Sequence, residues 1–73
     1  MKKEGVLKKI GMRIKLLREE RKITQQVLAA ECNFEKSNMS RIESGGSNFT
    51  IATLLKICEV LKVKLSDIVE GVD

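Results

Sequence analysis

The sequence predicts an all-α fold, a compact bundle of five short helices, and three observations carry this prediction. Apolar residues recur at spacings of three and four along most of the chain, as in amphipathic helices, and no segment shows the alternation typical of a half-buried strand. The 73 residues include no Pro, which would interrupt helix interiors. A chain of this length has room for one hydrophobic core, so we expect a single domain over residues 1–73.

The first helix is expected over residues 6–21, where Leu7, Ile10, Ile14 and Leu17 form an apolar stripe. Its polar flank is rich in cations: residues 1–22 hold nine Lys and Arg against three Glu, a net charge of +6, while the whole chain carries +4. One end of the molecule is therefore basic, as expected of a surface that faces a polyanion. A solvated, lysine-rich helix would account for the same charges.

The second helix is expected over residues 25–32. Thr24 follows an apolar residue and can cap the helix N-terminus with its hydroxyl, and Asn33 tolerates the left-handed conformation that ends a helix. The residues expected to face inward are Val27, Leu28 and Cys32, with Ala29 and Ala30 allowing the close approach of another helix.

The third helix is expected over residues 36–43, with Met39 and Ile42 facing the core and with Gly45 and Gly46 ending it through positive φ angles. At about 100° per residue, the direction opposite to the core holds hydroxyl and cationic side chains and no acid. These outward residues are Lys36, Ser37, Ser40, Arg41 and Ser44. Arg and Lys can hydrogen-bond guanine and Ser can bond several base edges, so this face suits DNA. A solvated helix face would be equally polar, but it explains the absence of acids poorly.

Thr50 is expected to cap a fourth helix over residues 51–61, and a fifth helix is expected over residues 66–70. The residues expected on the apolar face of the fourth helix are Ile51, Leu54, Leu55, Cys58 and Leu61. The second and third helices, joined by a tight turn, amount to a helix-turn-helix.

The composition argues against several classes of function. The chain has no His and two Cys, whereas a zinc site needs about four ligands, so no metal and no cofactor is expected. Cys32 and Cys58 are expected to be buried, reduced thiols of a cytoplasmic protein. The longest uncharged run is twelve residues, too short to span a membrane, and the N-terminus lacks the apolar segment of a signal peptide. Without His, Tyr or an inward-facing pair of carboxylates there is no catalytic constellation, so we do not expect an enzyme.

Three motifs together resemble the XRE family of phage-repressor and Cro-type helix-turn-helix proteins. They are "ITQQVLA", which opens the second helix, "MSRIESG", which ends the third, and "TLLKICEVL" in the fourth. The resemblance runs from Ile10 to Ile68. It implies a lambda-repressor-like DNA-binding domain of five helices, whose third helix enters the major groove of double-stranded DNA.

The resemblance also implies roles for individual residues. Base contacts would come from Lys36, Ser37 and Arg41. Phosphate contacts, or support of the base-reading side chains, would come from Thr24, Gln25, Asn38, Ser40, Ser44, Ser47 and Asn48. Arg18 and Glu43 match a pair that forms a salt bridge between the first and third helices, and two unpaired surface charges are the alternative. Gly46 stands where the family commonly has Lys, so the loop lacks one phosphate-binding cation.

We therefore expect a sequence-specific transcriptional regulator, a repressor or autoregulator, that binds double-stranded DNA as a homodimer on a two-fold symmetric operator. The candidate dimer interface consists of the apolar residues left over at the C-terminus, Leu65, Ile68, Val69 and Val72. Closure of the domain's own core by Leu65 and Ile68 is the alternative use of these residues. Two other functions remain open: an antitoxin or adaptor that binds a partner protein such as a toxin, and a restriction–modification controller.

Overall fold

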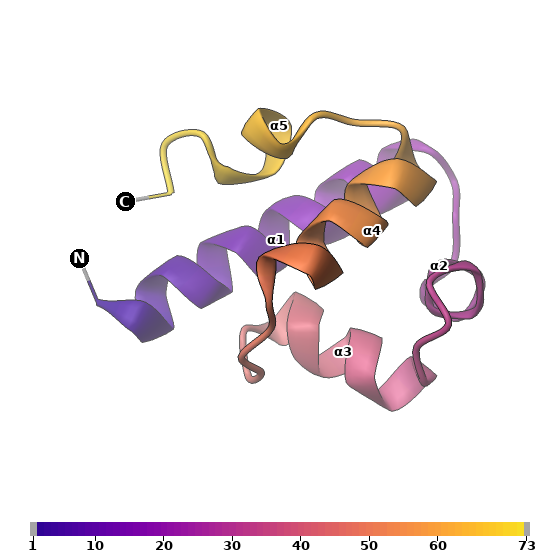
Figure 1. The fold of residues 1–73 in the computed structure, drawn as a ribbon, viewed down its shortest axis with the longest axis horizontal. Coiled ribbons are helices and arrows are strands. Elements are labelled where there is room, and N and C mark those ends of the chain that lie inside the picture. The colour runs from indigo at the N-terminus through magenta and orange to yellow at the C-terminus, as the bar shows by residue number, and fades with distance from the viewer. Residues whose placement is uncertain (1, 73) are drawn as a thin grey trace.

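Figure 1 shows the computed structural model of the protein, which describes residues 2–72. Five helices follow one another through short loops, and the described residues contain no strand. The helices are α1 (Lys3–Glu20), α2 (Gln25–Glu31), α3 (Lys36–Ser44), α4 (Ile51–Leu61) and α5 (Leu65–Val69). The predicted all-α, five-helix fold is confirmed. α1 begins three residues before its predicted start, and every other helix end lies within one residue of its predicted position.

Two threonine hydroxyls define where helices begin. The Thr24 hydroxyl accepts a hydrogen bond from the backbone N–H of Val27 at 3.1 Å and caps α2. The Thr50 hydroxyl accepts one from the backbone N–H of Thr53 at 3.2 Å and caps α4. Both threonines cap the helices that the sequence predicts them to cap. In each case the donor is the backbone N–H three residues beyond the threonine.

Left-handed residues define where helices end. Gly45 closes α3 with a φ of 82°, a conformation that glycine adopts without steric cost. The prediction that Gly46 shares this role is wrong, since Gly46 is not among the residues with positive φ and one left-handed residue is enough to end the helix. Asn33 ends the turn after α2 with a φ of 60°, and Lys62 closes α4 with a φ of 59°.

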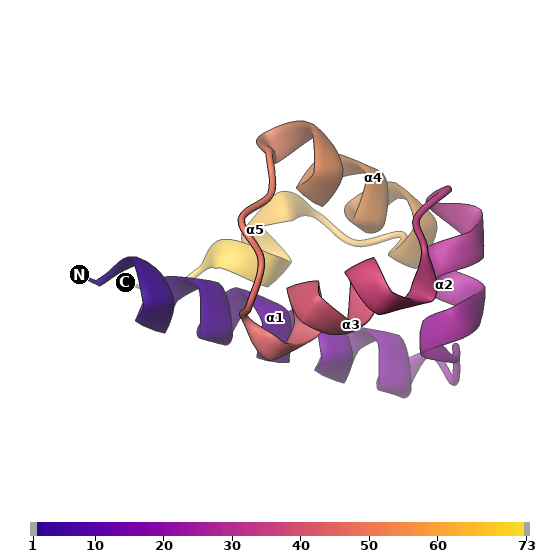
Figure 2. The ribbon, with the colours of Figure 1, turned by 90° about the horizontal axis from the view of Figure 1, so that it is seen from below.

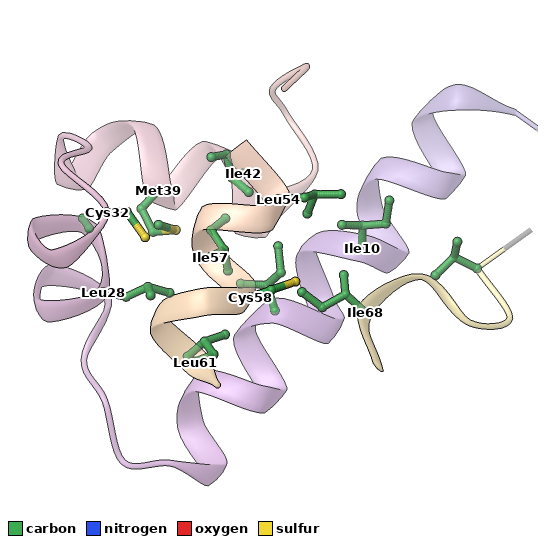
Figure 3. Close-up of a cluster of buried hydrophobic side chains, with 13 residues drawn as sticks. Ile10, Leu28, Cys32, Met39, Ile42, Leu54, Ile57, Cys58, Leu61 and Ile68 are labelled. Atoms are coloured by element: carbon green, nitrogen blue, oxygen red, sulfur yellow. The ribbon is translucent and has the colours of Figure 1, made fainter. Parts of the chain in front are cut away.

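A single hydrophobic core lies where the five helices meet (Figure 3). α4 contributes its largest share, four buried residues on one side of the helix. The thirteen buried apolar residues are Ile10, Ile14, Leu28, Ala29, Cys32, Met39, Ile42, Leu54, Ile57, Cys58, Leu61, Ile68 and Val72. Cys32 and Cys58 are buried here, and burial raises the pKa of both thiols.

Three residues that we predicted to face inward lie on the surface instead. Val27 is 47% exposed, Ile51 61% and Leu55 50%. The buried face of α4 is centred near Leu54 and Leu61, which places Leu55 about 110° to its side at about 100° per residue. Ile51 is the first residue of the helix. In α2 the neighbouring Leu28 takes the inward direction, so Val27 is turned outward.

α1 and α3 pack with unusually close backbones, and Figure 2 shows them side by side. A Cβ atom at Gly11 of α1 would lie 2.4 Å from the backbone oxygen of Ile42 and 2.5 Å from that of Glu43. Just past the end of α3, a Cβ atom at Gly45 would lie 2.7 Å from the Cα of Lys8. Glycine at both positions therefore allows α3 to lie directly on α1.

The C-terminal residues close the domain's own core, which corrects part of the predicted dimer interface. Ile68 is fully buried and Val72 is 8% exposed, so neither side chain is free to meet a second copy. Leu65 and Val69 are half-buried and pack against the same core. α5 has only five residues, too few to be stable alone, and it packs its apolar side chains against α1 and α4.

Candidate nucleic-acid interface

The outer face of α3 is exposed, and its main polar side chains make no interactions with the rest of the described residues. Lys36, Ser37 and Arg41 are all exposed, while Met39 and Ile42 on the opposite side are buried. Within residues 2–72, no hydrogen bond or ion pair engages the side chains of Lys36, Ser37 or Arg41. Two cations and a small hydroxyl therefore project from one rigid helix without internal partners.

A short turn holds α2 and α3 together ahead of this face. The backbone N–H of Phe34 donates to the carbonyl oxygen of Ala29 at 2.8 Å, and the N–H of Asn33 donates to that of Ala30 at 3.1 Å. Glu35 occupies the N-cap position of α3, but its side chain makes no capping hydrogen bond. The amino end of α3 therefore carries no side-chain cap and keeps its positive partial charge.

An ion pair fixes the orientation of α3 on α1. The Nε of Arg18 donates to Glu43 Oε2 at 2.7 Å, and its Nη2 donates to Glu43 Oε1 at 3.1 Å. Both residues are buried, with exposures of 8% and 7%. The hydrogen bond to Glu43 raises the pKa of Arg18 further and outweighs the opposing effect of burial, so the guanidinium stays charged.

The same carboxylate also ties α2 into the assembly. Gln25 Nε2 donates to Glu43 Oε1 at 3.0 Å, and Arg18 Nη1 donates to the carbonyl oxygen of Ile23 at 2.8 Å. Glu43 thus joins α1, α2 and α3 at one point. We did not predict the link between Gln25 and Glu43 from the sequence.

The segment that follows α3 presents polar groups beside the outer face. The Ser44 hydroxyl donates to the carbonyl oxygen of Arg41 at 3.0 Å, and the Ser47 hydroxyl donates to that of Asn48 at 3.1 Å. Ser44 and Asn48 are exposed, while Ser47 is half-buried. Each hydroxyl uses its proton locally, and its oxygen remains open as an acceptor.

The other residues predicted to support DNA binding have different positions in the structure. Thr24 uses its hydroxyl oxygen as the α2 cap, and Asn38 is half-buried in the first turn of α3. Ser40 is exposed and lines a shallow groove of about 190 Å³ between α3 and α1. The structure thus gathers Gln25, Ser40 and Ser44 around one depression.

The walls of this depression include residues of α1 that we did not predict as site residues. Lys15 lines the groove together with Gln25, Ser40, Glu43 and Ser44. A second groove of about 300 Å³ adjoins it, lined by Lys8, Met12, Lys15, Glu43 and Ser44. The sequence did place Lys8 and Lys15 on the polar flank of the first helix, but only packing shows that this flank borders α3.

Two other kinds of site find no support in the described residues. No group of three or more His, Cys, Asp or Glu side chains in residues 2–72 is placed to hold a metal ion. Within the same range, no helix has the length and apolar character needed to cross a bilayer.

A short turn between two helices, the second held by a buried ion pair and presenting an outer face without acids, is the arrangement of a helix-turn-helix DNA-binding domain. Residues 13–73 match the family model of the Cro/C1-type HTH DNA-binding domain, and the chain belongs to that family. This assignment confirms the predicted resemblance and identifies the chain as a helix-turn-helix DNA-binding domain.

Individual proteins show the same likeness. The immunity repressor protein of Bacillus phage phi105 is 38% identical over 60 residues, which cover 82% of this chain and 42% of that protein. The restriction-modification controller protein C.AhdI of Aeromonas hydrophila is 26% identical with a TM-score of 0.82, over 85% of this chain and 94% of the controller. An HTH_3 family transcriptional regulator of Vibrio cholerae is 30% identical with a TM-score of 0.85, over 92% of this chain and 38% of the regulator. The chain therefore spans less than half the length of the phage repressor and of the Vibrio regulator.

Proposed function

We propose that this protein regulates transcription by binding double-stranded DNA sequence-specifically, as a homodimer on a two-fold symmetric operator. In this role it acts in the cytoplasm as a repressor or autoregulator. The observation that carries the proposal is the outer face of α3, where the side chains of Lys36, Ser37 and Arg41 are exposed and have no hydrogen-bond or ion-pair partner among residues 2–72. The likeness to a phage immunity repressor and to a restriction-modification controller supports it.

Base recognition would fall to these three side chains. Arg41 can bond O6 and N7 of a guanine with two hydrogen bonds, whereas Lys36 and Ser37 can bond base edges less directionally. The short side chains of Ser37 and Ser40 allow the helix backbone to approach the floor of the major groove closely. Because the Arg18–Glu43 pair holds α3 rigidly, little conformational entropy is lost when the helix enters the groove.

Backbone contacts would position the helix. Gln25, Ser40 and Ser44 surround the groove beside α3, where a phosphate oxygen can meet the amide and hydroxyl groups. Ser47 and Asn48 extend this polar edge along the α3–α4 loop. Thr24 and Asn38 would act mainly as supports, the first by capping α2 and the second from within the first turn of α3.

Dimerisation requires an apolar surface that the domain does not bury itself. Ile51 and Leu55 of α4 meet this requirement, since they are 61% and 50% exposed and lie one helical turn apart. A two-fold axis beside α4 would pack this pair against its copy, an isologous contact. The half-buried Leu65 and Val69 remain as rim candidates. Two copies of α3 would then enter successive major grooves, about 34 Å apart.

Selection of bound sites from a random library of double-stranded DNA tests the proposal. We expect enrichment of sites with two-fold symmetry and a half-site spacing of about one helical turn. Enrichment of asymmetric sites would contradict the homodimer. Absence of any enrichment would contradict sequence-specific binding and would favour the antitoxin or adaptor role, in which a partner protein is bound instead.

A more specific role, control of a restriction–modification operon, is favoured by the likeness to C.AhdI, which this chain matches over nearly the whole length of that controller. The likeness to the phage repressor covers less than half of that protein and favours a repressor role less specifically. Neighbouring reading frames discriminate between the roles, because a restriction enzyme and a methyltransferase would accompany a controller. A neighbouring toxin gene would indicate an antitoxin.

A further inference from the structure

One face of α1 carries a stripe of three side chains that belong neither to the hydrophobic core nor to the outer face of α3. Lys8, Met12 and Lys15 are spaced by four and three residues, so they share one side of the helix. All three are exposed, and Met12 is 63% exposed. The stripe lies against the last turn of α3, because Lys8, Met12 and Lys15 line the same groove as Ser44.

The groove beside this stripe attracts anions. Among its lining residues the single acid is Glu43, whose carboxylate already accepts hydrogen bonds from Arg18 and Gln25. Arg18 cancels the charge of Glu43 at contact distance, which leaves the charges of Lys8 and Lys15 uncompensated at the groove. Neither lysine has an ion-pair partner within residues 2–72.

One lysine of the stripe also lies beside the α3–α4 loop. Gly46 in the α3–α4 loop provides no side chain to bind a phosphate, and Lys8 lies against the start of this loop. A Cβ atom at Gly45 would lie 2.7 Å from both the Cα and the Cγ of Lys8. Lys8 therefore brings a cation of α1 to the start of this loop.

We propose that Lys8 and Lys15 form a second binding track for the DNA backbone, on the α1 side of the α3 reading face. This inference rests on the proposed function and names a further part of its DNA-binding site. Lys8 and Lys15 lie two helical turns apart, about 10 Å along the axis, a length over which one DNA strand presents two or more phosphates. Met12 lies between the two lysines, where its exposed thioether can contact deoxyribose.

The double variant Lys8→Gln/Lys15→Gln tests the track on the best site selected from the random library. Binding constants are measured over a range of about 50 to 200 mM salt. The homodimer carries four of these lysines, two in each protomer. We therefore expect the slope of log K against log salt to become shallower by about 3.6, or about 0.9 for each phosphate that the variant dimer no longer neutralises. The ranking of DNA sequences should stay unchanged, because these lysines read no bases.

The matched control is Lys62→Gln/Lys64→Gln, which removes the same charge from the loop between α4 and α5. Both lysines are exposed, and neither forms an ion pair within residues 2–72. Figure 1 places α5 and the loop that precedes it on the opposite side of α1 from α3, so the control should bind with the slope of the wild type. Equal slopes for the lysine-stripe variant and the wild type would overturn the track while leaving the proposed function intact. An equal change in the control would overturn it too, since net charge alone would explain the weaker binding. Failure of the wild type to bind DNA would refute the proposed function itself.

Discussion

The guanidinium of Arg18 holds the carboxylate of Glu43 through two hydrogen bonds of 2.7 and 3.1 Å, although 25 positions separate the two residues in the chain. These hydrogen bonds join α1 to α3 behind the face that we propose reads DNA. Since both residues are buried, removal of one partner leaves a charge that nearby water cannot fully solvate.

We predict that Glu43→Ala destabilises the domain by about 2–3 kcal/mol. This is less than the roughly 3–5 kcal/mol of a fully enclosed pair, because Glu43 also borders the groove between α1 and α3. Denaturant unfolding measures the loss of stability. The double variant Arg18→Met/Glu43→Leu should recover part of it, since no isolated charge remains. A loss below about 1 kcal/mol for Glu43→Ala would mean that the pair behaves as a surface ion pair.

Substitution of Gly11 by Ala tests the close approach of α1 and α3. The added Cβ would lie 2.4 Å from the backbone oxygen of Ile42, so one helix must shift. We expect a loss of about 1–3 kcal/mol in thermal or denaturant unfolding. Gly5→Ala is the matched control, because a Cβ there meets nothing within 4 Å. The control should stabilise α1 slightly, by up to about 1 kcal/mol. Equal effects of the two substitutions would refute the close approach.

Arg41→Ala should weaken binding to the selected operator by about 1–3 kcal/mol and relax the preference at particular base pairs. Titrations against the operator and against single-base variants measure both effects. Ser44→Ala provides a comparison at the edge of the same helix, where removal of a phosphate-binding group should weaken all sequences alike. If Arg41→Ala also weakens all sequences alike, Arg41 contacts phosphate and does not read a base.

Leu55→Glu should convert a dimer into a monomer without unfolding it. Leu55 is 50% exposed, and a carboxylate at the centre of an isologous contact faces its own copy. Leu16→Glu on α1 is the matched control, because Leu16 is 52% exposed on a different helix. Sedimentation at micromolar concentration reports the assembly state. A dimer that survives Leu55→Glu would exclude this α4 surface, and a monomeric wild type would exclude the homodimer.

Burial of the two thiols gives the domain an alkaline limit. Because the pKa of Cys32 and Cys58 is raised in the folded state, the unfolded chain loses these protons first, near its ordinary value of 9.0. Their contribution to stability is complete below that pH and is lost as the pH rises through the folded-state pKa. The variant Cys32→Ala/Cys58→Ala should therefore show a shallower fall of unfolding free energy above about pH 9. Identical pH profiles for variant and wild type would contradict this account.

Most of the helical architecture could be predicted from local sequence signals. Thr24 and Thr50 cap the helices that they were predicted to cap, and each does so through a bond to a residue three positions away. The core positions of α3, Met39 and Ile42, follow from helical periodicity alone. Such interactions span one helical turn, so the sequence around them contains all the information that they require.

Two of the three wrongly placed inward residues lie where two adjacent apolar residues compete for one inward direction. Leu55 follows Leu54 and Val27 precedes Leu28, and in each pair the helix can bury only one member. Which member is buried depends on how the whole helix is rotated against its neighbours, and hydrophobicity does not reveal that rotation. The same limit applied to Ile68 and Val72, whose apolar character suits a dimer interface and a core equally well.

The five helices, their ends and the acid-free face of α3 were all encoded locally, because each depends on residues within a turn of one another. Three features depended instead on how the helices pack: Gln25 shares the carboxylate of Glu43, Ile51 and Leu55 remain uncovered, and Lys8 and Lys15 border the last turn of α3. These features escape a reading of the sequence because the packing of α1 against α3 at Gly11 brings together side chains that are distant in the chain.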